Sequence, residues 1–208
     1  MPHSHATLQQ RIAYTFHDPT LLQTALTHPS IKGHTPAAQD YQRLEFLGDA
    51  VLGLIFAETL YATATPNATE GALSEARAHL ARGSTLATAA RRLHLAQHLH
   101  TTPHGDTQRI RNTDTASEDA LEALFGALYL DGGLDAARTL ARQLFATELQ
   151  NNLTQPEQNR SPKNRLQEHL QQTNNTPPPR IEYRLATETG PPHARHFTMQ
   201  VWVNDTLL

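Results

Sequence analysis

Residues 41–57 read YQRLEFLGDAVLGLIFA, and this stretch predicts the central helix of the protein. At about 100° per residue, its apolar side chains cover nearly the whole circumference of a helix, which is expected only in a protein interior. Glu45 and Asp49 are four residues apart and share one face of that helix, with Gln42 one turn earlier on the same side. Two carboxylates on a buried helix require a proton or a compensating positive charge.

A second apolar helix, predicted over residues 117–130, carries a matching pair of acids. Asp119 and Glu122 are three residues apart and share a face, with Gly126 one turn further along it. A glycine inside a helix costs about 1 kcal/mol relative to alanine, so Gly126 and Gly48 indicate places where two backbones approach closely. If the two helices pack through these faces, their four carboxylates meet in one small volume.

Four clustered carboxylates favour a metal ion. Unit charges about 4 Å apart repel by roughly 4 kcal/mol at an effective dielectric constant of about 20. The chain has no cysteine, and oxygen ligands alone favour Mg²⁺ or Mn²⁺ over zinc. Such an ion polarises a phosphoryl oxygen, activates a water and stabilises the leaving oxygen. The residues alone therefore indicate a helical protein that binds a divalent metal, a class that includes phosphohydrolases and di-metal bundles; acidic pairs on a solvated helix surface are the alternative.

The remaining sequence up to residue 150 predicts shorter helices around this pair. They are expected over residues 6–14, 20–27, 72–81, 84–93 and 134–149. Asp18 is the expected N-cap of the second of these, followed by Pro19 at its first position, and Ser84 is the expected cap of the fourth. Residues 94–115 are polar and predicted to be irregular, and Asp131, Gly132 and Gly133 are expected to end the helix that starts at residue 117. Residues 1–150 therefore predict an all-α domain.

A second, smaller domain is expected after a linker. Residues 151–162 are rich in Asn, Gln and Pro and lack hydrophobic periodicity. A short helix over 163–172 is then followed by two alternating segments, residues 181–185 and 197–203, which predict a β-hairpin. The expected fold class is an all-α domain followed by a small, incomplete α+β domain at residues 163–208.

Hydropathy favours a cytoplasmic protein, and charge is distributed unevenly along the chain. The formal net charge is -3, with acid concentrated in residues 1–150, which carry 11 basic against 15 acidic residues, while residues 151–208 carry 6 against 5. The longest unbroken apolar run, residues 54–57, is too short to span a bilayer, and the N-terminus lacks a basic segment followed by a hydrophobic one. No membrane partner is expected.

Residues 43–52, RLEFLGDAVL, resemble the signature of bacterial ribonuclease III. The other matching segments follow in the family's order: ALTHPS at 25–30, EGALS at 70–74, DALEAL at 119–124 and LDGG at 130–133. The resemblance implies an all-helical endonuclease domain that forms a homodimer and cuts double-stranded RNA with Mg²⁺, or Mn²⁺ as a substitute. It further implies 5′-phosphate and 3′-hydroxyl ends with short 3′ overhangs, and a role in processing ribosomal RNA and other structured transcripts.

The resemblance also implies roles for individual residues. The positions that match the family's metal-binding carboxylates, with Asp49 and Glu122 also taken as catalytic, are Glu45, Asp49, Asp119 and Glu122. Glu70 matches a further acidic position near that site. Gln42 stands where several family members have glutamate, and we expect the neutral amide to tune metal affinity.

Residues 163–208 resemble a double-stranded-RNA-binding domain, a module that reads the shape and backbone of the duplex. The positions that match its RNA contacts are Asn164, Gln167, Glu168 and His193. Because the sequence stops at Leu208, the domain is expected to be truncated after its second strand and to bury too little surface for independent stability. RNA contacts from the first domain are then expected from its arginines, namely Arg77, Arg82, Arg91, Arg92, Arg109 and Arg111.

The leading hypothesis is thus a Mg²⁺-dependent, double-strand-specific endoribonuclease. A non-cleaving protein that binds double-stranded RNA and keeps the fold is the first alternative, although it gains nothing from the repulsion among buried acids. A helical metal phosphohydrolase for small nucleotides is the second, and the C-terminal segment does not fit it.

Overall fold

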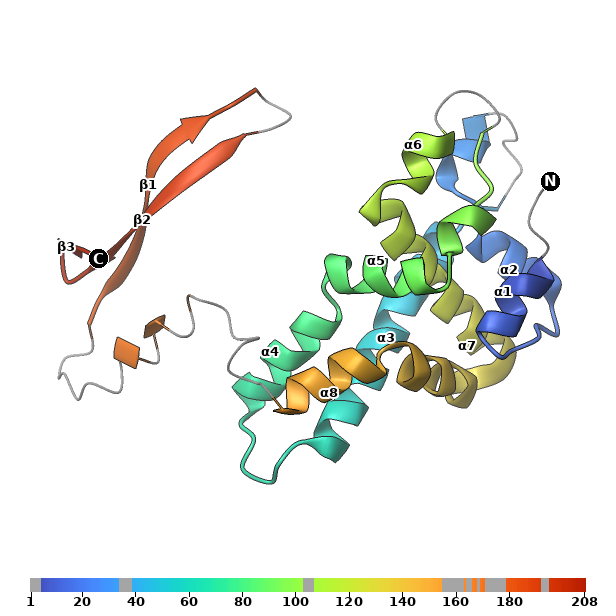
Figure 1. The fold of residues 1–208 in the computed structure, drawn as a ribbon, viewed down its shortest axis with the longest axis horizontal. Helices are drawn as coiled ribbons and strands as arrows, with labels where there is room; N and C mark the ends of the chain where they lie inside the picture. Colours follow the sequence, from blue (N-terminus) through green and yellow to red (C-terminus); the bar gives the residue numbers. More distant parts are fainter. Residues whose placement is uncertain are drawn as a thin grey trace. The chain divides into compact units, whose positions relative to one another are not determined.

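The structure is a computed structural model that describes residues 5–33, 39–102, 107–154, 163, 166–167, 169–170, 179–191 and 195–208. The chain divides into two compact units, Met1–Asn159 and Arg160–Leu208. Figure 1 shows that the first unit is helical and that the second carries a small antiparallel sheet. The expected fold class, an all-α domain followed by a small α+β domain, is confirmed.

Shorter helices surround two long ones in the first unit (Figure 1). The elements are α1 (His5–Arg11), α2 (Pro19–Ala25), η1 (Pro29–Gly33), α3 (Gln42–Thr63), α4 (Glu70–Leu80), α5 (Gly83–Arg92), η2 (Leu95–His98), α6 (Thr107–Arg111), α7 (Asp114–Leu144) and α8 (Ala146–Thr154). The most extensive contact in the unit is between α3 and α7. These two helices contain the two acidic pairs found in the sequence.

The helices α3 and α7 touch backbone to backbone at two glycines. A Cβ atom placed on Gly48 would collide with the backbone carbonyl of Glu122, and one placed on Gly126 would collide with the carbonyl of Leu44. Around this contact the buried side chains of α3 include Val51 and Ile55. The predicted close approach of the two helices is therefore confirmed.

The prediction that α3 is buried on all sides is wrong. Its opposite face carries Phe46 and Tyr61, each 82% exposed, and Leu54, which is 48% exposed. Periodicity cannot distinguish a face that packs in the core from an apolar face that lies at the surface. By length and composition α3 would also be able to cross a membrane; in this structure one of its faces packs in the core.

The helix α7 differs from the prediction at both ends. It begins at Asp114 because the Thr113 side chain caps it, accepting the N–H of Ala116. It continues past residue 130 to Leu144, with a kink at Gly133. The φ of Gly133 is 74°, a positive value that glycine adopts without steric cost. The predicted break at residues 131–133 is therefore a kink, and the chain separates α7 from α8 only at the buried Phe145.

Asp131 ties the N-terminal segment to α7. Its carboxylate accepts the backbone N–H groups of His17 and Asp18 and the hydroxyl of Tyr14. Burial alone would raise the pKa of Asp131, but these hydrogen bonds outweigh burial and lower the pKa to about 2. An acid that was expected to end a helix is instead the anchor of a distant loop.

Two other local predictions have opposite outcomes. The side chain of Asp18 accepts the N–H of Thr20 at the start of α2, as predicted. Ser84 does not cap α5, which begins at Gly83 with no side-chain cap. Residues 94–115, predicted to be irregular, contain η2 and α6.

In the second unit, β1 (Ile181–Thr189), β2 (His196–Val203) and β3 (Thr206–Leu207) form an antiparallel sheet in that order. The predicted hairpin of the first two strands is present, and the pairs include Tyr183 with Val201. A third strand, β3, was not predicted from the sequence; it pairs with β2 after a turn with positive φ at Asn204 and Asp205. Residues 163, 166–167 and 169–170 are helical, within the predicted short helix.

The contact at Gly48 makes a stability prediction. Gly48→Ala forces α3 away from α7, and we expect it to lower the free energy of unfolding by about 3 kcal/mol or more. The control is Gly71→Ala in α4, where a new Cβ meets open space and stability rises by up to about 1 kcal/mol. Urea unfolding followed by circular dichroism measures both. Equal effects of the two substitutions would contradict the backbone contact.

Candidate active site

Four carboxylates from α3 and α7 come together beside the glycine contact. Glu45 and Asp49 flank Gly48 on α3, and the backbone carbonyl of Glu122 on α7 lies directly against that glycine. The predicted acids differ in burial: Glu45, Asp119 and Glu122 are half-buried, whereas Asp49 is exposed. The sequence-predicted acids thus share one region of the surface.

Glu122 lies at the electrostatic centre of this group. Burial, together with the negative charges of nearby acids, raises its pKa to about 8; these acids are Asp49, Glu118, Glu45 and Asp119. At neutral pH and without a cation, Glu122 therefore favours its protonated form. The charges that raise the pKa of Glu122 come from both members of the α3 pair and from its neighbours on α7.

The other half-buried acids respond in the same direction. Burial raises the pKa of Glu45, and the charges of Asp119 and Glu118 raise it further. Burial also raises the pKa of Asp119, although hydrogen bonding from Tyr41 and the proximity of His28 partly offset the rise. The cluster therefore stores repulsion that a bound cation would relieve.

Glu118 is a fifth acid that the sequence analysis did not assign. It precedes Asp119 on α7, is half-buried, and its carboxylate packs against Gly83 at the start of α5. Burial raises its pKa, as does the charge of Asp119. The four-residue spacing between Glu118 and Glu122 was the available signal, because it places both on one face of α7.

Tyr41 and His28 also adjoin the cluster and were missed. The Tyr41 hydroxyl donates a hydrogen bond to Asp119 Oδ2 at 3.2 Å, and the His28 ring meets the Tyr41 ring edge-on. Burial and the charge of Asp119 raise the pKa of Tyr41, so its hydroxyl stays protonated and remains a donor. Burial lowers the pKa of His28, against the opposing effect of Asp119.

The donor set of the cluster fits a hard divalent cation. All of its ligand atoms are carboxylate oxygens, which suit Mg²⁺ or Mn²⁺ better than softer metals. Among the residues that the structure describes, no three Asp, Glu or His side chains converge closely enough to form a ready coordination site. The acids therefore lie in one region of the protein, but their side chains do not converge on a single point that a metal ion could occupy.

Two residues assigned near the site in the sequence lie at its margin. Glu70 is exposed at the start of α4, where its carboxylate accepts the hydroxyl of Ser74. It is not among the charges that raise the pKa of Glu122. Gln42 is exposed in the first turn of α3.

Three of the candidate RNA-binding arginines make contacts within the first unit. Arg91 pairs with Asp114, and Arg92 pairs with Glu148 and donates to a backbone carbonyl of α7. Arg111 donates to the carbonyl of Leu99. The others are exposed, namely Arg77, Arg82 and Arg109.

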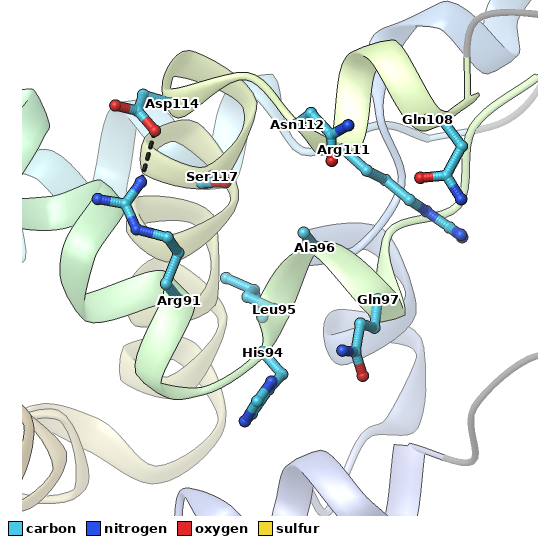
Figure 2. Close-up of a pocket in the computed structure, with 10 residues that line it drawn as sticks. All are labelled: Arg91, His94, Leu95, Ala96, Gln97, Gln108, Arg111, Asn112, Asp114 and Ser117. Atoms are coloured by element: carbon cyan, nitrogen blue, oxygen red, sulfur yellow. Dashed lines mark hydrogen bonds and ion pairs between the residues drawn. The ribbon is translucent and has the colours of Figure 1, made fainter.

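Two pockets lie near these residues. Figure 2 shows the larger, of about 840 Å³, with the Arg91–Asp114 pair on one side and Arg111 with Gln108 on the other. The smaller, of about 290 Å³, adjoins the acidic cluster itself, because His28, Arg109 and Asp119 all line it. The positively charged Arg109 and the candidate metal ligand Asp119 therefore line the same pocket.

Most of the predicted RNA contacts of the second unit lie outside the described residues. These are Asn164, Glu168 and His193. Gln167 is described; it is helical and exposed.

Comparison with known proteins covers both units. Residues 18–149 match the family model described as Ribonuclease-III-like, and residues 162–208 match that of the double-stranded RNA binding motif. A Ribonuclease 3 of Heliobacterium modesticaldum is 39% identical, over 100% of this chain and 86% of that protein. One of Chlorobium luteolum is 44% identical, over 88% of this chain and 66% of that protein.

A solved structure resembles the first unit. It is the nuclease domain of ribonuclease III from Campylobacter jejuni, with a TM-score of 0.64 and 34% identity, over 70% of this chain and 98% of that one. Its description names a region of that protein involved in dimer formation. The Heliobacterium modesticaldum protein aligns with the whole chain, over both units. The chain therefore belongs to the ribonuclease III family of double-strand-specific endoribonucleases.

Proposed function

We propose that the protein is a Mg²⁺-dependent endoribonuclease that hydrolyses phosphodiester bonds of double-stranded RNA. The observation that carries the proposal is the gathering of Glu45, Asp49, Asp119 and Glu122 from two helices, with Glu122 held under strong negative potential. Membership of the family supports the substrate class. Mn²⁺ is the expected substitute because it prefers the same oxygen ligands.

The four acids would hold the ion, with Asp49 and Glu122 nearest to the chemistry. When bound, a divalent cation polarises the scissile phosphate and lowers the pKa of a coordinated water. Glu122 must first release its proton, since its pKa of about 8 keeps it neutral at physiological pH without a cation. Glu70 stays a proposed additional acid.

The products proposed are 5′-phosphate and 3′-hydroxyl ends, which follow from attack by water with the 3′ oxygen as leaving group. The substrates proposed are ribosomal RNA precursors and other structured transcripts in the cytoplasm. Both rest on the family resemblance of residues 43–52 and 119–124. The RNA contacts proposed for the second unit are Asn164, Gln167, Glu168 and His193.

We also propose that two copies pair through the exposed face of α3. Phe46 and Tyr61 are each 82% exposed on that face, with the small residues Ala50 and Ala57 between them. Large exposed apolar patches mark association surfaces. Because Phe46 lies between Glu45 and Gly48 in the sequence, this face borders the acidic cluster, and pairing would place two sites on one dimer.

The cleavage proposal is tested with a long RNA duplex incubated with the protein in Mg²⁺ or in EDTA. We expect cutting only in Mg²⁺, and a loss of at least about 100-fold in Glu122→Ala. Asp135→Asn is the matched control, because this acid is also on α7 but points to solvent, with 92% of its side chain exposed. Wild-type protein that binds the duplex in Mg²⁺ without cutting it would identify a non-cleaving RNA-binding protein instead.

Glu122 also makes a pH prediction for the metal-free protein. The pKa of Glu122 is raised from 4.5 to about 8 by folding, so the folded state loses stability as pH rises between these values. Glu122→Gln removes this loss. After a discount for solvent screening, we expect the variant to be about 1–2 kcal/mol more stable than wild type at pH 8.5 and similar at pH 4.5. Urea unfolding in EDTA measures this; a gain independent of pH would contradict it.

The dimer proposal is tested by Phe46→Glu, which places a charge on the exposed apolar face of α3. Sedimentation velocity is expected to show a dimer for wild type and a monomer for the variant. Phe197→Glu is the control, since Phe197 is an exposed aromatic side chain on β2, in the second unit. A variant that sediments as wild type does would place the contact elsewhere.

A further inference from the structure

Backbone hydrogen bonds hold Tyr41 in place through both its N–H and its carbonyl. It directly precedes α3 and is only 2% exposed. Its backbone N–H donates to the carbonyl of Thr27 at 3.0 Å, and its own carbonyl accepts the N–H of Glu45 at 2.8 Å. The same residue therefore joins the end of α2 to the turn of α3 that carries the first acid of the cluster.

The aromatic ring of Tyr41 is held by His28. The two rings meet edge to face, with centroids 5.6 Å apart and planes at 85°. His28 is itself held, because its ring Nδ1 accepts the backbone N–H of Ser30 at 3.0 Å and its backbone N–H donates to the carbonyl of His100 at 2.9 Å. The direction of the Tyr41 hydroxyl is set by these contacts.

That hydroxyl donates to Asp119 Oδ2 at 3.2 Å, across 78 residues of sequence. A carboxylate offers about four lone-pair positions, so the bond from Tyr41 and the backbone hydrogen bond that Asp119 also accepts leave further positions for a ligand. Asp119 also lines the smaller pocket, together with His28 and Arg109. The tyrosine therefore restrains the orientation of a carboxylate that is accessible to a ligand.

We infer that Tyr41 is a positioning residue of the metal site: its hydroxyl orients the Asp119 carboxylate so that its remaining lone pairs are available to a divalent cation. The inference rests on the proposed function, because it requires that Asp119 binds the ion. Groups that orient a metal ligand in this way typically change metal affinity by about 10- to 100-fold when they are removed.

The test is Tyr41→Phe, which keeps the ring and its contact with His28 and removes only the hydroxyl. Mn²⁺ binding to the full-length protein without RNA, followed by electron paramagnetic resonance, should weaken by about 10-fold or more. Tyr14→Phe is the matched control, because the Tyr14 hydroxyl also donates to a carboxylate, Asp131 Oδ2, at 2.7 Å but away from the cluster. It should lower thermal stability and leave Mn²⁺ affinity unchanged.

Cleavage of an RNA duplex gives a second readout. In Tyr41→Phe the Mg²⁺ concentration for half-maximal cleavage should rise by the same factor, while the rate at saturating Mg²⁺ returns toward that of wild type. A tyrosine with only a structural role would lower stability without this separation. Mn²⁺ affinity equal to wild type in Tyr41→Phe would overturn the inference alone, whereas wild-type protein that binds no Mn²⁺ would overturn the proposed function with it.

A double-substitution cycle with Asp119→Asn distinguishes an effect of Tyr41 through Asp119 from a general disturbance of the fold. If Tyr41 acts through Asp119, then adding Tyr41→Phe to Asp119→Asn should cause no further loss of Mn²⁺ affinity. The same loss in both backgrounds would mean that the tyrosine acts on the fold as a whole, and would overturn the inference.

Discussion

The backbones of α3 and α7 meet at Gly48 and Gly126, and the geometry of the acidic cluster depends on this contact. Because neither position tolerates a Cβ atom, the two helices approach more closely than side chains would permit. The carbonyl of Glu122 lies against Gly48, the residue that precedes Asp49 and follows Glu45 by one turn. Packing of apolar side chains on either side of the glycines then fixes the register in which the acids face one another.

The acidic cluster lowers the stability of the metal-free protein. Burial and mutual repulsion raise the pKa values of Glu45, Asp119 and Glu122, and each raised value is a free-energy cost of the charged form. Apolar packing offsets this cost in the absence of an ion. A divalent cation would remove the repulsion, so the strain left in the metal-free fold favours binding. Sites that break a local rule of stability in this way are commonly functional.

Part of the fold and of the candidate site could be predicted from the sequence, for physical reasons. Acids at a spacing of three or four residues must share a helix face, and a glycine within an apolar helix implies a close neighbour, so both helices and their facing acids could be predicted. The exposed Phe46 could not, because an apolar surface face and a core face have the same periodicity. The continuity of α7 past Asp131 was also hidden, since its carboxylate is satisfied by the distant residues Tyr14, His17 and Asp18. The bond between Tyr41 and Asp119 joins residues 78 apart and leaves no local signal.

The central claim is that α3 and α7 together build one cation site. The most direct test is a crystal of the full-length protein soaked in Mn²⁺ and measured for anomalous scattering. The account predicts a manganese peak bounded by carboxylate oxygens of both helices, from Glu45 or Asp49 on one side and Asp119 or Glu122 on the other. A peak bound by one helix alone, or manganese found only elsewhere on the protein, would contradict it.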